Sequence, residues 1–391
     1  MGFLDNVLYF TLHPLHLQYI LQRKYFRKDT LSNLTPFQKV CLHYLDKTGR
    51  SYSFVIKSIH AELLFPVAIF YLILRGLDTI EDDGSIPSDQ KVELLRRFKD
   101  VLDIDGWTFT ENGEGAEDRD LLLNFDNVIT EFKNLKPAYR EVMKDITAKM
   151  GSGMAKYTCT NATSVNTINE YDEYCWYVAG LVGEGLTRLF IEAGFVDRAL
   201  LERKHLYKSM GLLLQKTNII RDVHEDYVDG RRFWPEEIWS NHVEKFDSLF
   251  DSEKGHTEGV LDCSTHMILN ALSHVEDCLT YVSALMEPSI FGFCAIPEVM
   301  ALSTLELCFR NPESFERNLK ISKRDAIGIM YEVETGGMSG FCAVVSRYTK
   351  RIEEKCLHSD PNFVEMRGVC AKIEKTIDAL LRSQRTSVRG I

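Results

Sequence analysis

The sequence reads Leu74-Arg75-Gly76-Leu77-Asp78-Thr79-Ile80-Glu81-Asp82-Asp83 at the end of an apolar run that extends from Leu63 to Leu77. Such a run is typical of a buried core helix. Residues three and four positions apart share a face of a helix, so Asp78, Glu81 and Asp82 are expected to project together. Carboxylates on one face repel one another, and a bound cation would relieve that repulsion.

A second acidic stretch reads Gln215-Lys216-Thr217-Asn218-Ile219-Ile220-Arg221-Asp222-Val223-His224-Glu225-Asp226, and it repeats this spacing. One acidic run alone is more often the solvated end of a helix. Two matching runs, each beside an arginine that can bind phosphate oxygens, favour a shared site for Mg²⁺ and substrate phosphates. We therefore predict opposite walls of one cavity, with six metal ligands: Asp78, Glu81, Asp82, Asp222, Glu225 and Asp226.

Composition limits the class of protein. The chain has 391 residues, 45% of them hydrophobic, and a formal charge of −11, which argues against a nucleic-acid partner. Its ten cysteines form no C-x-x-C pair, as in a reducing compartment. We find no secretory signal at the start and no uninterrupted apolar run of about 18 residues. As it stands, the chain is expected to be soluble and cytoplasmic.

Helical periodicity recurs along the chain, and strand-type alternation is nowhere sustained. We predict a single all-α domain over residues 35–382, after an N-terminal segment (1–34) and before a basic tail (383–391). Gly49 is expected to break the first helix, whereas Gly180, Gly183 and Gly185 are expected where helices approach closely. The helices are predicted near residues 35–48, 63–83, 91–102, 121–132, 138–157, 168–193, 198–227, 265–286, 289–309, 325–333 and 341–357.

The motifs together resemble those of the squalene synthases (farnesyl-diphosphate farnesyltransferases) in the squalene/phytoene synthase family. The likeness rests on the two acidic stretches, on Tyr174-Cys175-Trp176-Tyr177-Val178-Ala179-Gly180, on Phe233-Trp234-Pro235 and on Phe293-Cys294-Ala295-Ile296-Pro297. The resemblance implies a class I isoprenoid synthase fold, with helices around a central cavity. It implies head-to-head condensation of two farnesyl diphosphates to presqualene diphosphate. Reduction by NADPH to squalene, in sterol or related triterpene biosynthesis, would follow.

The resemblance also implies roles for individual residues. Tyr174 would accept the proton released on condensation, and Asp78, Asp82, Asp222 and Asp226 would act with it in catalysis. The residues implied for NADPH and phosphate binding are Arg50, Arg75, Asn218, Arg221, Arg231 and Lys320. The expected substrate-binding residues are Ser51, Tyr71, Gln215, Phe291 and Phe293; for the aromatic ones, ordinary core packing is the alternative.

The family is typically anchored to the cytosolic face of the endoplasmic reticulum by a terminal membrane helix, and we expect no such helix within this sequence. The resemblance therefore implies membrane association without an anchor in this chain, and we expect a monomer.

Several positions depart from the family pattern. They are Gly49, Tyr52, Phe54, Leu64-Phe65-Pro66, Gly76 and Ser322, the last of which stands where a second basic residue follows Lys320 in relatives. Because most lie around the expected pocket, we hypothesise a specialised or inhibitor-tolerant paralogue. The rival interpretations are a non-reducing phytoene-type synthase, a head-to-tail elongase and a non-catalytic relative that binds farnesyl diphosphate.

Overall fold

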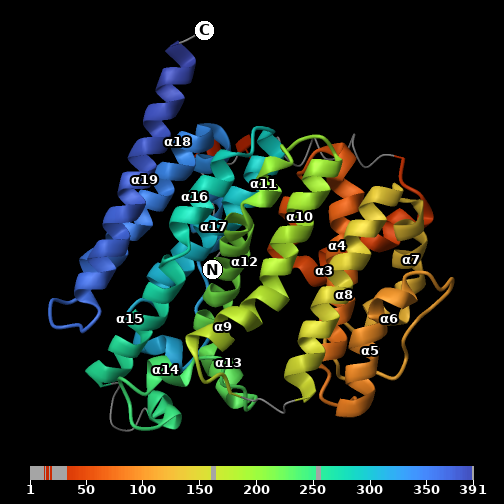
Figure 1. Ribbon diagram of the computed structural model, residues 1–391, viewed down its shortest axis with the longest axis horizontal. Coiled ribbons are helices and arrows are strands. Elements are labelled where there is room, and N and C mark those ends of the chain that lie inside the picture. The colour runs from red at the N-terminus through yellow and green to blue at the C-terminus, as the bar shows by residue number, and fades with distance from the viewer. Residues whose placement is uncertain are drawn as a thin grey trace. The chain divides into compact units, whose positions relative to one another are not determined.

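The computed structural model describes residues 13, 15, 16, 18, 19, 33–159, 164–251 and 257–389. Over these residues the regular elements are all helices (Figure 1), apart from one isolated bridge between Ser164 and Arg232. The all-α prediction is confirmed. The side chains of residues 50, 51, 159 and 385–389 lie outside the described part, as does most of the predicted N-terminal segment.

The chain divides into two compact units. One, the α4 unit, comprises Gln18–Ala162 and Leu181–Arg203; the other, the α12 unit, comprises Met1–Leu17, Thr163–Gly180 and Lys204–Ile391. The boundaries predicted at residues 34 and 382 stay predictions.

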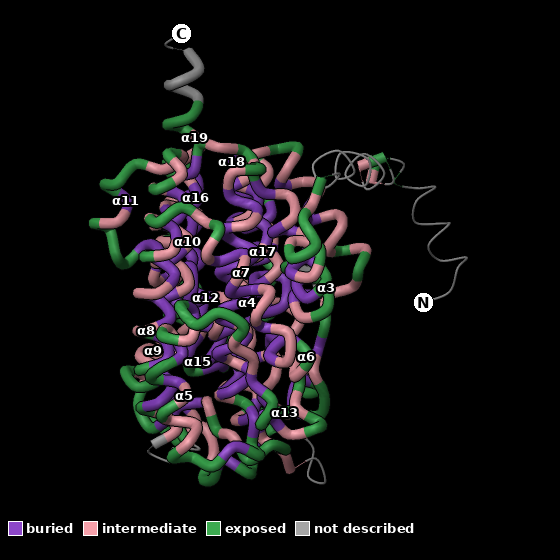
Figure 2. Tube along the Cα trace, turned by 90° about the vertical axis from the view of Figure 1, so that its right-hand side faces the viewer, coloured by how far each residue is buried: buried purple, intermediate pink, exposed green. Residues whose placement is uncertain are grey.

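The α4 unit is built around α4, which is buried along most of its length (Figure 2). Its helices are α3 (Pro36–Ile56), α4 (Ala61–Asp82), α5 (Ser88–Val101), α6 (Arg119–Leu123), α7 (Phe125–Asn134), α8 (Pro137–Cys159), α10 (Leu181–Glu192) and α11 (Ala199–Glu202). Thr35 and Gln38 form a capping box that starts α3, as the Thr35-Pro36 pair predicts. Helix α4 packs against α3, α5, α7, α8 and α10.

Glycines in the α4 unit behave in two ways. At Gly185 an added Cβ would lie 2.4 Å from Cζ of Phe70 on α4, so the predicted close approach is confirmed there. The prediction that Gly49 breaks the first helix is wrong, because α3 continues through Gly49 to Ile56. The ring of Tyr71 packs over Gly49, and the buried residues on either side keep one apolar face of α3 toward the core.

The α12 unit is built around α12, which packs against the π-helical segment η1 and against α15, α16 and α17. Helix α17 packs on α18, and α19 covers α15, α16 and α18 (Figure 1). The elements are α9 (Ile168–Cys175), η1 (Trp176–Gly180), α12 (Lys204–Arg221), α13 (Val223–Val228), α14 (Glu236–Trp239), η2 (Phe246–Phe250), α15 (Glu258–Leu272), α16 (Val275–Ser283), α17 (Pro288–Cys308), η4 (Pro312–Phe315), α18 (Lys323–Lys355) and α19 (Phe363–Arg389).

Three long predicted helices are interrupted in the structure. The 168–193 helix contains a π-helical turn at Trp176–Gly180. The 198–227 helix is divided into α11, α12 and α13, with a break at Asp222, whose backbone (φ −96°, ψ 13°) is not α-helical. The 265–286 helix divides at Ser273–His274. The predicted break near Gly337 is confirmed, since its φ of 55° and ψ of −140° kink α18.

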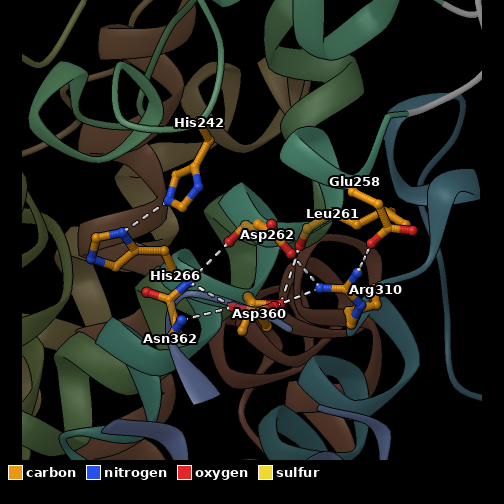
Figure 3. A network of polar contacts seen from close by, with 9 residues as sticks. His242, Glu258, Leu261, Asp262, His266, Arg310, Asp360 and Asn362 are labelled. Carbon is orange, nitrogen blue, oxygen red and sulfur yellow. Dashed lines mark hydrogen bonds and ion pairs between the residues drawn. The ribbon is translucent and has the colours of Figure 1, made fainter. Parts of the chain in front are cut away.

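A buried polar network anchors the end of α17 to α15 and to the segment before α19 (Figure 3). The Arg310 guanidinium contacts Asp262 (2.6 Å), Asp360 (2.5 Å) and Glu258. The Asp360 carboxylate also accepts hydrogen bonds from the backbone and side-chain nitrogens of Asn362. Arg310 directly follows Phe309, the C-cap of α17, and has a positive φ of 48°, so the network holds it in a backbone conformation that is unusual for a residue other than glycine.

In the part of the chain that the structure describes, two helices, α4 and α17, are long and apolar enough to cross a membrane by length and composition alone. Both helices are mostly buried in the protein. Such burial is typical of core helices, and the sequence predicted a core helix for the run Leu63 to Leu77 in α4.

Candidate active site

The first acidic cluster lies on the last turns of α4, where Arg75 binds several carboxylates. Its guanidinium donates to Asp78 (2.6 Å) and to Asp118 (2.6 Å), and Glu117 lies 3.6 Å away. Asp118 is held in this contact from the loop before α6, with a positive φ of 57°. Arg75 therefore already partly neutralises the face that the sequence predicts as a cation site.

Asp78 is electrostatically perturbed. Burial raises its pKa to about 7, the neighbouring Asp82 adds to the rise, and Arg75 opposes it. A carboxylate whose pKa is raised in this way is stabilised in its charged form by a further positive charge nearby.

The Lys91 ammonium of α5 donates to the Glu81 carbonyl (2.6 Å), so it supports the end of α4.

Asp83, the last acidic residue of the stretch, has a structural role. Its carboxylate accepts hydrogen bonds from Ser85, from the Gly113 amide (3.0 Å) and from Asn112 (3.2 Å). Burial acts to raise its pKa, but these hydrogen bonds outweigh burial and lower it. Asp83 therefore ties the end of α4 to the loop at Asn112–Gly113.

The second acidic cluster spans the break between α12 and α13. The Arg221 guanidinium donates to both Asp222 oxygens, one at 2.8 Å. Arg231 holds the buried Asp226 carboxylate (3.0 Å), and Asn318 donates to Glu225. Burial raises the pKa of Asp226 to about 7, Arg231 opposes the rise, and Asp222 and Glu225 add to it.

Tyr174 is linked to this second cluster through an aromatic ring. Its ring stacks on Phe233 with centroids 4.9 Å apart and an interplanar angle of 20°. The guanidinium of Arg231 lies over the same Phe233 ring at 6.0 Å, and Arg231 binds Asp226. The structure thus joins the predicted base to a predicted metal ligand within one unit.

The other predicted residues of the α12 unit fall into three groups. Gln215 and Asn218 are half-buried on α12, two turns and one turn before Asp222. Phe291 and Phe293 are half-buried on α17, and Phe291 meets Phe341 edge to face at 6.1 Å. Lys320 is exposed, two residues after the Asn318 that binds Glu225.

In the α4 unit, Tyr71 is half-buried on α4, near Thr48 and Gly49. Burial raises the pKa of its hydroxyl. Arg50 and Ser51 follow on α3, and their side chains lie outside the described residues. The predicted apposition of the two acidic clusters spans both units and stays a prediction.

The donor set fits a hard divalent cation, since both clusters offer only oxygen ligands. Among the residues that the structure describes, no three His, Cys, Asp or Glu side chains stand close enough to hold an ion as they are. An arginine pairs with a carboxylate in each cluster, Arg75 with Asp78 and Arg231 with Asp226. Burial and neighbouring carboxylates raise the pKa values of both aspartates. Both observations describe acidic groups that a cation would stabilise.

Two departures from the family pattern have structural explanations. At Gly76 an added Cβ would lie 2.6 Å from Cε2 of Phe125, so the α4–α7 packing requires a glycine there. Ser322 is the N-cap of α18: its hydroxyl accepts from the Asp325 amide (3.1 Å) and donates to the Asp325 carboxylate (2.6 Å).

Sequence reasoning did not identify several residues that position the site. They are Asp118 beside Arg75, Phe233 beside Tyr174, Asn318 beside Glu225 and the buried Lys216 on α12. Lys216 had a signal in the sequence, because it is a lysine in an otherwise buried helical stretch. The other three are brought to their partners by loops, which leave no periodic pattern.

Comparison with known proteins gives consistent matches. A family model described as squalene/phytoene synthase matches residues 45–325. The chain is 50% identical over 392 residues to a probable squalene synthase of Neurospora crassa, covering 98% of this chain and 81% of that protein. It is 42% identical over 388 residues to squalene synthase ERG9 of Saccharomyces cerevisiae, covering 97% and 86%. A solved structure of TcSQS with the ligand E5700 aligns with a TM-score of 0.84 at 34% identity, covering 88% and 99%.

Proposed function

The chain belongs to the squalene/phytoene synthase family, and on that premise we propose that it is a squalene synthase. It joins two molecules of farnesyl diphosphate head to head into presqualene diphosphate and reduces that product with NADPH to squalene. The observation that carries the proposal is the Tyr174–Phe233–Arg231–Asp226 arrangement, which holds a phenol beside an acidic cluster suited to a metal-bound diphosphate.

The first chemical requirement is stabilisation of a leaving diphosphate. Breaking the allylic C–O bond increases the negative charge on the diphosphate, so positive groups that meet this charge lower the barrier. Arg75, Arg221 and Arg50 are assigned this role. Arg75 and Arg221 are paired with Asp78 and Asp222, so each guanidinium is oriented by a neighbouring carboxylate.

Asp78, Glu81, Asp82, Asp222, Glu225 and Asp226 would hold Mg²⁺, and the bound ion would supply Lewis-acid stabilisation of the diphosphate. Tyr71, Phe291 and Phe293 would line the wall for the isoprenoid chain, with Ser51 and Gln215 at its polar end. Aromatic faces suit a carbocation, and their apolar surroundings exclude water.

The second requirement is a proton acceptor. When the cyclopropane ring closes, the electrons of a C–H bond form the new C–C bond, and the proton must leave. We assign the Tyr174 oxygen as acceptor, with its own hydroxyl proton passing to the released diphosphate. An ordinary phenol is a weak base, so the neighbouring diphosphate and Arg231 are needed for this role.

The NADPH site is assigned to Asn218, Arg231 and Lys320, together with Arg50, Arg75 and Arg221. Lys320 is exposed next to the Asn318–Glu225 contact, so it can reach a nucleotide phosphate near the second cluster. We propose a monomer that acts at the cytosolic face of the endoplasmic reticulum.

The test is product identification by mass spectrometry after incubation with farnesyl diphosphate, Mg²⁺ and NADPH. Squalene, with presqualene diphosphate when NADPH is omitted, is the expected result. A hydrocarbon released without NADPH would favour the phytoene-type alternative. Farnesyl diphosphate binding without diphosphate release would favour a non-catalytic relative.

The paralogue hypothesis has a separate test. If the departures at Tyr52, Phe54, Phe65 and Pro66 specialise the pocket, polyanionic mimics of the substrate should inhibit this enzyme less than an ordinary squalene synthase. Equal inhibition of the two enzymes would remove the hypothesis.

A further inference from the structure

A buried lysine crosses the interior of the α12 unit and contacts the helix that carries Tyr174. Lys216 of α12 is 1% exposed. Its ammonium lies 2.6 Å from the Asp172 carboxylate and hydrogen-bonds to Asn270 Oδ1 (2.6 Å) and His274 Nε2 (2.9 Å). A buried ammonium is retained only when such partners offset the loss of water.

The network continues away from Tyr174. Because Lys216 can only donate, His274 Nε2 accepts, and Nδ1 carries the imidazole proton toward the Ser209 hydroxyl (3.3 Å). Ser209 donates in turn to Asp277 (2.7 Å). Asp172 therefore ends the network on α9, and Asp277 ends it on α16.

Asp172 lies two residues before Tyr174, so the two side chains leave α9 on opposite sides. The Asp172 side points to α12, where Lys216 also lies over the Tyr171 ring at 5.2 Å. The other side presents Tyr174 to Phe233. Helix α9 is thus held on one side through Asp172 and on the other through the Tyr174 ring.

A second contact joins α12 to the segment that follows α9. At Gly211 of α12 an added Cβ would lie 2.4 Å from the Ala179 carbonyl oxygen, so the two backbones touch. Ala179 belongs to the π-helical turn Trp176–Gly180, which follows α9 directly. Such turns are frequent at functional sites. Tyr174 is therefore fixed relative to α12, and α12 ends at Arg221, directly before Asp222.

We propose that the Asp172–Lys216 pair is a positioning device that fixes the Tyr174 oxygen relative to the second acidic cluster. This inference rests on the proposed function, since it assigns a role only if Tyr174 accepts the proton. The pair acts through Tyr174 and touches no substrate. Its loss is expected to slow proton removal more than diphosphate departure.

The test uses Asp172→Asn with Asp277→Asn as its matched control. Asp172 is 31% exposed, so the isosteric amide is expected to fold. Without NADPH, condensation yields one diphosphate per presqualene diphosphate, and a cation that is not deprotonated in time is captured by water. Asp172→Asn should therefore raise the ratio of diphosphate to presqualene diphosphate and lower kcat for condensation about tenfold, with KM little changed. Asp277→Asn removes a charge from the same network but should leave the ratio at one.

A purely structural role would lower the melting temperature of both variants and leave the ratio unchanged. If Asp172→Asn is recovered unfolded, Asp172→Glu keeps the charge but adds a methylene, and it must raise the same ratio. A wild-type ratio in a folded variant at position 172 overturns the inference. A wild-type enzyme that forms no presqualene diphosphate would instead refute the proposed function.

Discussion

At the scale of single residues, Glu298 shows how burial fixes a protonation state. It is 1% exposed on α17, and its carboxyl lies beside the Cys278 thiol of α16. Burial raises its pKa well above the ordinary value of 4.5, and the Cys278 thiol opposes this only in part. The native carboxyl therefore stays protonated at pH values where the unfolded chain would be ionised.

The sign of the pH dependence follows from this difference. Above about pH 4.5 the native chain binds more protons than the unfolded chain, so the free energy of unfolding falls as the pH rises. Glu298→Gln should raise stability at pH 8 and reduce the loss between pH 5 and pH 8, measured by urea unfolding. Glu306→Gln, on the same helix but paired with Lys355, should leave that loss in place. If Glu298→Gln loses as much stability between pH 5 and pH 8 as the wild type, the Glu298 carboxyl is not protonated in the native protein.

The acidic clusters give a second residue-scale prediction. Asp82→Asn and Asp222→Asn should each lower diphosphate release about 10²–10³-fold, because each removes a carboxylate that we propose as a metal ligand. Asp89→Asn removes an exposed carboxylate seven residues after Asp82 and should have no such effect. Diphosphate assays compare the three, and full activity in Asp222→Asn would exclude the second cluster from the site.

Tyr174→Phe tests the proton acceptor. The variant keeps the stack on Phe233 and should fold normally, while presqualene diphosphate formation falls to background. Circular dichroism checks the fold. Retained condensation in Tyr174→Phe would refute its assignment as the base.

At the scale of elements, the Gly185–Phe70 contact determines how closely α10 and α4 approach. Gly185→Ala should destabilise the protein by about 1–3 kcal/mol, since the added methyl has no room beside the ring. Phe70→Leu in the same chain shortens the opposing side chain and should recover part of that loss. Thermal unfolding of the two single variants and the double variant measures the coupling, and strictly additive losses would contradict it.

The Arg310 network gives the second element-scale prediction. Arg310→Met leaves Asp262 and the fully buried Asp360 side chain without their cation, which should cost about 3–5 kcal/mol. Arg317→Met breaks only an exposed pair with Glu313 and should change stability by less than about 1 kcal/mol. Similar losses in both variants would mean that the network does not stabilise the end of α17.

The elements also show which parts of a fold the sequence predicts. Long apolar periodicity predicted α4, and the Thr35-Pro36 cap predicted the start of α3. The breaks at Asp222 and at Ser273–His274 were missed, because local periodicity continues through them and only tertiary packing ends the helices. At Gly49 the sequence predicted a break that does not occur. A glycine inside a helix costs only about 1 kcal/mol, which the packing of α3 can offset.

At the scale of the whole molecule, paired motifs predicted the family, and the matches over nearly the whole chain agree. The sequence also predicted which carboxylates share a helix face. It could not predict that Asp83 is a structural acceptor or that Ser322 caps a helix. The Asp83 role depends on the loop at Asn112–Gly113, which comes from elsewhere in the chain. The Ser322 cap is local, but it depends on where α18 begins, at Lys323.

The central claim is that both acidic clusters bind one diphosphate through Mg²⁺. The most direct measurement is a crystal structure with Mg²⁺ and an unreactive farnesyl diphosphate analogue. The account predicts that carboxylates from Asp78 and Asp82 and from Asp222 and Asp226 bind metal ions around the same diphosphate. A diphosphate held by only one cluster, with the other turned away or packed against protein, would contradict it.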